Sequence, residues 1–95
     1  MKRAPRTAPD DDATDIIAAV TSSIWAEVEK VVTMPEEVTV TGEIRDGKLL
    51  VVTVKAHPDD RSLVWGKNRK TKNRLVYVAT KLAAGHKLRA WVEIL

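Results

Sequence analysis

The chain has 95 residues, of which 44% are hydrophobic and 31% charged. This length allows one small domain with one hydrophobic core, and the composition is typical of a soluble globular protein. The absence of cysteine excludes disulfides and thiolate zinc sites. No apolar run is long enough for a membrane span, and the first residues lack the apolar stretch of a signal peptide. We therefore expect a cytoplasmic protein without a membrane association.

The net charge of +3 is distributed very unevenly along the chain. Residues 1–60 hold 7 Lys and Arg against 12 Asp and Glu, a net charge of −5. Residues 61–95 hold 9 Lys and Arg against Glu93 alone, a net charge of +8. A one-sided block of this kind is typical of a surface that binds a polyanion, and nucleic acid is the first candidate. A solvated basic surface without a ligand is the alternative.

The N-terminal third is predicted to be a short tail followed by one long helix. Residues 1–9 carry two prolines and three basic side chains, which indicates a flexible basic tail before a single domain at residues 10–95. Asp10–Asp12 place negative charge where a helix begins, and one of them or Thr14 is the expected cap. An apolar stripe with helical spacing follows: Ile17, Val20, Ile24, Val28 and Val31. It predicts a helix over residues 11–33, which ends before Pro35.

The middle of the chain predicts a β-hairpin. Val38–Thr41 alternates β-branched side chains, and a second apolar run extends from Leu49 to Ala56. Asp46-Gly47 lies between them and favours a tight turn in which both residues have positive φ.

The last third predicts two helices and a strand. Pro58-Asp59-Asp60 is expected to cap a short helix that ends at Gly66. A third helix begins near Thr71 and ends near Gly85, with Leu75, Val78, Ala79 and Leu82 on its apolar side. The final run alternates apolar and polar side chains from Leu88 to Ile94, which predicts a half-buried strand. The order α-β-β-α-α-β is that of an α+β fold with its helices on one face of a three-stranded sheet.

The segment between the last two helices is the strongest candidate for a functional site. Residues 67–74 contain five Lys and Arg, two Asn, one Thr and no acid. A helix N-terminus normally attracts Asp or Glu, so Arg69, Lys70 and Lys72 oppose the helix dipole there. An anionic ligand such as a phosphate would compensate for this arrangement.

The residues of this region resemble the KH domain. The resemblance rests on Pro58-Asp59-Asp60, on Val64-Trp65-Gly66-Lys67-Asn68, and on Lys70-Thr71, Asn73 and Leu75. With the predicted element order, the chain is similar to the type II KH arrangement of small bacterial single-KH-domain RNA-binding proteins. The resemblance implies that a Gly-x-x-Gly loop holds the backbone of about four nucleotides.

Arg69 departs from the pattern, because it stands where that loop has its second glycine. Arg69 either contacts phosphate itself, or single-strand binding has been lost and the fold serves another purpose.

We expect Gly66 to allow a close approach and the cations to neutralise phosphates. The binding residues are predicted to be Gly66, Lys67, Asn68, Arg69, Lys70, Thr71, Lys72, Asn73, Arg74, Lys87 and Arg89. Asn68, Thr71 and Asn73 would form hydrogen bonds. Trp65 and Tyr77 are candidates for base stacking. Lys70, Arg74, Tyr77 and Lys81 fall on one helical face, either as a phosphate-tracking stripe or as a solvated surface.

Two alternatives to RNA binding remain open at this point. Strand alternation places Leu49, Val51 and Trp91 on the sheet face away from the helices, where they would suit a homodimer or a protein partner. Single-stranded or duplex DNA is the other alternative, the duplex if the basic helix makes the contacts. The spacing of His57 and His86 suggests no metal site, and no catalytic side-chain arrangement stands out, so we expect no cofactor and no enzymatic activity.

Overall fold

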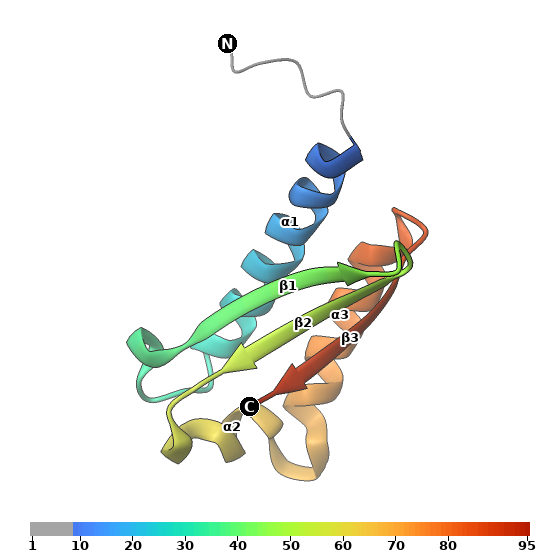
Figure 1. Cartoon of the computed structure of the whole chain (residues 1–95). Coiled ribbons are helices and arrows are strands. Elements are labelled where there is room, and N and C mark those ends of the chain that lie inside the picture. Colours follow the sequence, from blue (N-terminus) through green and yellow to red (C-terminus); the bar gives the residue numbers. More distant parts are fainter. Residues whose placement is uncertain (1–8) are drawn as a thin grey trace.

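The structure, a computed structural model, describes residues 9–95, with side chains from Asp15 onward. These residues form an α+β fold, the class expected from the sequence (Figure 1). The elements are α1 (Pro9–Glu29), β1 (Thr39–Arg45), β2 (Leu49–Lys55), α2 (Arg61–Trp65), α3 (Lys70–Ala84) and β3 (Arg89–Ile94). Short 3-10 helices occur at η1 (Pro35–Glu37), η2 (Pro58–Asp60) and η3 (Lys67–Arg69).

Two predictions for the N-terminus fall mostly outside this description. The tail predicted at residues 1–9 lies outside the described residues except for Pro9, which begins α1. The backbone of Asp10–Asp12 and of Thr14 belongs to α1, but the side chains expected to cap the helix are not among those described.

The sheet has the strand order β1-β2-β3, in which β1 pairs antiparallel and β3 pairs parallel with the central β2. Asp46 and Gly47 have φ values of 55° and 67°, and the Lys48 amide donates to the Arg45 carbonyl at 3.1 Å. This geometry confirms the tight turn predicted from Asp46-Gly47.

Helices α1 and α3 lie side by side against one face of the sheet, with α2 near one end (Figure 1). The side chains between these layers are fully buried: Val20, Ile24 and Val28 from α1, Leu50, Val52 and Val54 from β2, Leu75, Ala79 and Ala83 from α3, and Val92 from β3. Gly42 lets α1 approach β1, because a Cβ there would lie 3.3 Å from methyl groups of both Ile17 and Thr21. The core thus uses most of the apolar stripes that the sequence predicts.

The buried carboxylate of Asp60 connects the end of α1 to the start of α2. It accepts the amides of Thr33 at 3.1 Å and Met34 at 2.9 Å, and the Thr33 hydroxyl at 2.7 Å. The Thr33 hydroxyl, followed by these amides, holds the pKa of Asp60 below its ordinary value.

The predicted end of α1 and the predicted capping role of Asp60 are both wrong. Helix α1 ends at Glu29 rather than near residue 33, and the Thr33 and Met34 amides donate to Asp60 instead of to a helical carbonyl. Asp60 also makes no side-chain cap to α2. At η2 the capping side chain is His57, whose Nδ1 accepts the Asp59 amide at 3.0 Å.

Helix α3 ends at Ala84 with Gly85 at the C-cap, which confirms the end predicted near Gly85. Gly85 keeps a helical φ of −63°, and the left-handed residue is Lys87, with a φ of 59°. The amides of Lys87 and Leu88 return to the carbonyls of Ala84 and Ala83 at 3.0 and 3.1 Å. This is the hydrogen-bond pattern of a Schellman motif, with lysine where glycine is usual.

Candidate nucleic-acid interface

Gly66 ends α2 in a conformation that suits only glycine, with φ 77° and ψ 162°. A Cβ at this position would lie 2.5 Å from Thr71 Oγ1 and 2.6 Å from the Thr71 amide nitrogen. The space that glycine leaves open is therefore occupied by the first turn of α3. Packing within the protein is enough to require glycine here, and a close approach of phosphate to Gly66 remains a prediction.

Two consecutive left-handed residues then turn the chain into α3. Asn68 and Arg69 have φ values of 56° and 62°, and the Arg69 amide donates to the Gly66 carbonyl at 3.1 Å. Arg69 precedes α3 at the N-cap position but makes no side-chain cap to the helix. Arg69, which replaces the expected second glycine, thus has a left-handed backbone conformation. Glycine adopts this conformation with the smallest energetic penalty.

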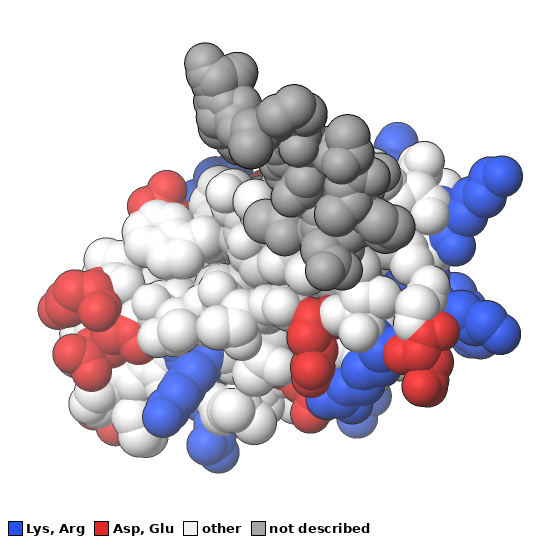
Figure 2. Space-filling view, turned by 45° about the horizontal axis from the view of Figure 1, so that its top comes forward, with Lys and Arg blue, Asp and Glu red and all other residues white. Residues whose placement is uncertain are grey.

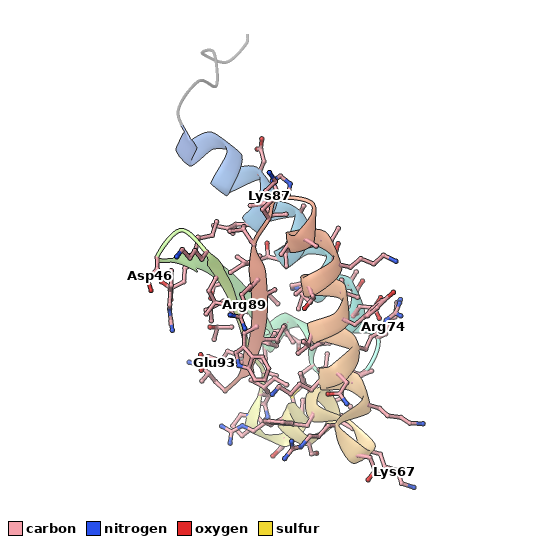
Figure 3. The ribbon with its side chains drawn as sticks, turned by 90° about the vertical axis from the view of Figure 1, so that its right-hand side faces the viewer. Asp46, Lys67, Arg74, Lys87, Arg89 and Glu93 are labelled. Carbon is pink, nitrogen blue, oxygen red and sulfur yellow. The ribbon has the colours of Figure 1, made fainter. Side chains whose placement is uncertain are left out.

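The loop between α2 and α3 exposes a cluster of positive charge. Lys67, Arg69 and Lys70 are all exposed. Within residues 15–95, none of these three has a carboxylate at ion-pair distance. Figure 3 shows Lys67 projecting from the end of the molecule. Because the helix dipole is also positive at this end, the loop is a region of uncompensated positive potential.

The outer face of α3 carries a second, weaker group of cations. Arg74 points away from β3 (Figure 3), and its Nε lies 3.5 Å from Glu27 Oε1 on α1. Lys81 Nζ lies 3.3 Å from the Tyr77 hydroxyl and 5.6 Å from its ring centroid. Lys70, Arg74, Tyr77 and Lys81 are exposed along this face, as their spacing predicts. Two of its three cations therefore already have partners.

Lys72 behaves differently from its neighbours, because its ammonium lies over two indole rings. Its Nζ is 4.7 Å from the ring centroid of Trp65 and 4.2 Å from that of Trp91. Arg69 Cζ is 5.9 Å from the Trp65 centroid. Trp65, which is half-buried, thus lies beneath two cations. No spacing in the sequence relates Lys72 to Trp91, so sequence reasoning missed this cluster.

The predicted binding residues do not all lie together. Figure 3 places Lys87 at the opposite end of α3 from Lys67, and this 15-residue helix is about 22 Å long. Arg89 lies on the sheet face away from α3, as does Glu93 (Figure 3). Asn73 is exposed on α3, whereas Thr71 packs against Gly66. A ligand at the loop would reach Lys87 only if it extended along the whole helix.

The open face of the sheet offers less apolar surface than the sequence suggests. Val51 pairs in register with Trp91 but is only 3% exposed, and Leu49 is half-buried. Trp91 is 46% exposed. On β1, Arg45 Nη2 lies 2.8 Å from Glu43 Oε1, and this contact raises the pKa of the Arg45 guanidinium. The exposed part of the predicted interface is therefore mainly Trp91.

Charges of both signs lie elsewhere on the surface. On the face in Figure 2, one group of Asp and Glu lies at the left-hand edge, while Lys and Arg at the right-hand side are interspersed with further acidic side chains. Among the side chains from Asp15 onward, no three His, Asp or Glu cluster as ligands for a metal ion. Within residues 9–95, no helix is sufficiently long and apolar for a membrane span.

Comparisons of the chain with protein-family models, with curated proteins and with solved structures found no match.

Proposed function

We propose that this chain is a KH-like domain that binds single-stranded RNA through residues 66–74. The observation that carries the proposal is the exposed loop in which Lys67, Arg69 and Lys70 have no carboxylate partner among the described residues. Repulsion among these cations, added to the positive end of α3, opposes folding unless an anion is bound. A sugar–phosphate backbone provides several such anions in a row.

Side chains rather than backbone amides would hold the phosphates. The Arg69 amide is already bonded to the Gly66 carbonyl, and the Lys70 amide to the Lys67 carbonyl. Arg69 can instead present its guanidinium fork to one phosphate in a bidentate contact. Lys67 and Lys70 would add point charges on either side. Binding by this means depends steeply on salt, because each neutralised phosphate releases counterions.

The distribution of free charge favours a single strand over a duplex. Duplex binding would place the outer face of α3 against the backbone, but Arg74 is paired with Glu27 and Lys81 contacts Tyr77. The unpaired cations are at the loop, beside the two indole rings near Lys72. A positive groove next to aromatic rings is a common means of binding unpaired nucleotides.

Fluorescence anisotropy with a short single-stranded RNA, measured at two salt concentrations, tests the proposal. We expect binding that weakens as salt rises, with weaker binding of a duplex. Lys67→Glu should lower the affinity and reduce the slope of log Kd against log salt by about 0.7. Lys48→Glu is the matched control, because Lys48 is also an exposed lysine but belongs to the β1–β2 turn at the other end of the molecule (Figure 1). No binding, equal affinity at both salt concentrations, or equal effects of the two substitutions would reject the proposal.

A further inference from the structure

Three elements converge on one small cluster beside the cationic loop. Trp65 ends α2, Lys72 lies in the first turn of α3, and Trp91 lies on β3. The Lys72 ammonium is over both indole rings, at 4.7 Å from the Trp65 centroid and 4.2 Å from the Trp91 centroid. Because Trp91 is 46% exposed, the cluster is accessible from solvent.

The position of the ammonium is a point that lies close to both indole rings at once. Stacked aromatic rings place their centroids about 4.5 to 7 Å apart. The Lys72 ammonium is inside this range from the Trp65 centroid, at 4.7 Å, and just below it from the Trp91 centroid, at 4.2 Å. A ring that replaced the ammonium would therefore need only a small shift away from Trp91 to stack on both indoles.

We propose that Trp65 and Trp91 form a clip that receives one nucleobase of the bound RNA, and that Lys72 occupies this clip in the free protein. When the base enters, the Lys72 side chain rotates out and its ammonium pairs with a phosphate of the same strand. The clip rests on the proposed RNA-binding function and assigns the subsite for a base within it.

The exchange replaces a weaker interaction with stronger ones. Lys72 has no carboxylate at ion-pair distance within residues 15–95, so only the two indoles hold its ammonium. A cation over a partly exposed ring contributes less than a base stacked on the same ring. The released ammonium gains a charge-assisted contact with phosphate. Only rotations about the lysine side chain are needed, so the loop and α3 can keep their backbone.

The competing explanation is that Lys72 joins α3 to β3 and that the indoles bind nothing else. The two explanations differ in whether binding depends on the presence of bases. A short oligoadenylate and an abasic sugar–phosphate strand of the same length carry equal backbone charge, so the ratio of their affinities measures the contribution of the bases. We expect the oligoadenylate to bind about 5- to 100-fold more tightly to the unmodified protein.

Trp91→Leu tests the clip while keeping an apolar side chain beside the buried Val51. We expect it to reduce the affinity ratio to near one and to leave the affinity for the abasic strand unchanged. Tyr77→Leu tests the competing stacking candidate that the sequence offers, an aromatic residue 55% exposed on the outer face of α3, because the clip assigns the base to Trp65 and Trp91 instead. It should keep the ratio of the unmodified protein. Thermal melting of each variant checks that the fold is retained.

The outcomes separate the clip from the RNA-binding proposal on which it rests. If neither strand binds, the RNA-binding proposal itself fails. If both strands bind with equal affinity, phosphate binding stands and the clip is wrong. The clip is also wrong if Trp91→Leu leaves the ratio unchanged, or if Tyr77→Leu alone removes it.

Discussion

Gly66 and Thr71 are so close that no side chain fits between them. A Cβ on Gly66 would lie 2.5 Å from Thr71 Oγ1 and 2.6 Å from the Thr71 amide nitrogen. This contact joins the end of α2 to the first turn of α3, and the exposed cations of the loop lie between its two ends. The shape of the candidate site therefore depends on one missing side chain.

Substitution of this glycine should destabilise the protein more than substitution of an otherwise similar glycine. Gly66→Ala combines a positive φ with overpacking against Thr71, so we expect the free energy of unfolding to fall by about 2 to 4 kcal/mol. Gly47→Ala is the control, because Gly47 also has a positive φ, 67°, but an added Cβ would meet nothing within 4 Å. We expect it to cost about 1 kcal/mol. Urea unfolding followed by tryptophan fluorescence measures both, and equal losses would contradict the role of the contact.

The open face of the sheet is predicted to remain free of a second copy of the chain. Stable interfaces bury at least about 1,200 Å² in total, with an apolar centre. Here Val51 is buried, and the Lys72 ammonium lies over the ring of Trp91. We therefore expect sedimentation equilibrium to give a monomer at all concentrations tested. If the protein is a dimer and Trp91→Leu dissociates it, the prediction is wrong and the open face is an interface between two copies.

Much of the fold follows from patterns that are local in the sequence. The helical spacing of Val20, Ile24 and Val28 predicts the buried side of α1, and Asp46-Gly47 predicts the hairpin turn. The position of the cationic loop can also be predicted, because a glycine and a run of cations lie between two helical stretches. In each case, the residues that determine the structure are close together in the chain.

The features that sequence reasoning missed depend on residues that only tertiary packing brings together. The Asp60 carboxylate accepts the amide of Thr33, which lies 27 residues earlier in the chain. The sequence alone predicts a more local role for Asp60, as a cap to the helix that follows it. Lys72 lies over Trp65 and Trp91 because α2, α3 and β3 meet at one end of the sheet. Neither contact has a periodicity or a motif from which it could be predicted.

The carboxylate of Asp60 should make stability depend on pH in the acid range. Hydrogen bonds to its ionised form lower its pKa in the folded state, so the stabilisation is complete at neutral pH. It begins to fall as the pH approaches the ordinary value for aspartate, about 3.9, and is lost once the pH passes below the folded-state pKa. Asp60→Asn should remove this pH dependence, because an amide does not ionise, although its oxygen can still accept the Thr33 and Met34 amides, which both donate to one carboxylate oxygen.

Urea unfolding of the unmodified protein and of Asp60→Asn at a series of pH values measures this effect. We expect the difference in the free energy of unfolding to be greatest at neutral pH and to shrink as the pH falls. Asp59→Asn is the control, because the Asp59 side chain is 81% exposed. A constant difference across the acid range would mean that the ionised carboxylate of Asp60 is not what stabilises this junction.

Arg69 and Lys87 form a matched pair for the test of the loop, because both are cations with a left-handed backbone. Their φ values are 62° and 59°, and they lie at the two ends of α3. Glycine at either position relieves backbone strain, so both Arg69→Gly and Lys87→Gly should raise the free energy of unfolding by about 0.5 to 1 kcal/mol. Both substitutions also remove one positive charge, so their effects on net charge are equal, whereas Arg69→Gly also relieves repulsion at the positive end of α3.

The effect on RNA binding should distinguish these two variants most clearly. If Arg69 holds a phosphate, Arg69→Gly lowers the affinity and reduces the salt slope by about 0.7, whereas Lys87→Gly leaves both nearly unchanged. Anisotropy titrations of a short single-stranded RNA at several salt concentrations measure these quantities. A rise in affinity for Arg69→Gly would show instead that glycine restores a backbone clamp that arginine had blocked. Equal losses for the two variants would place the RNA along the full length of α3.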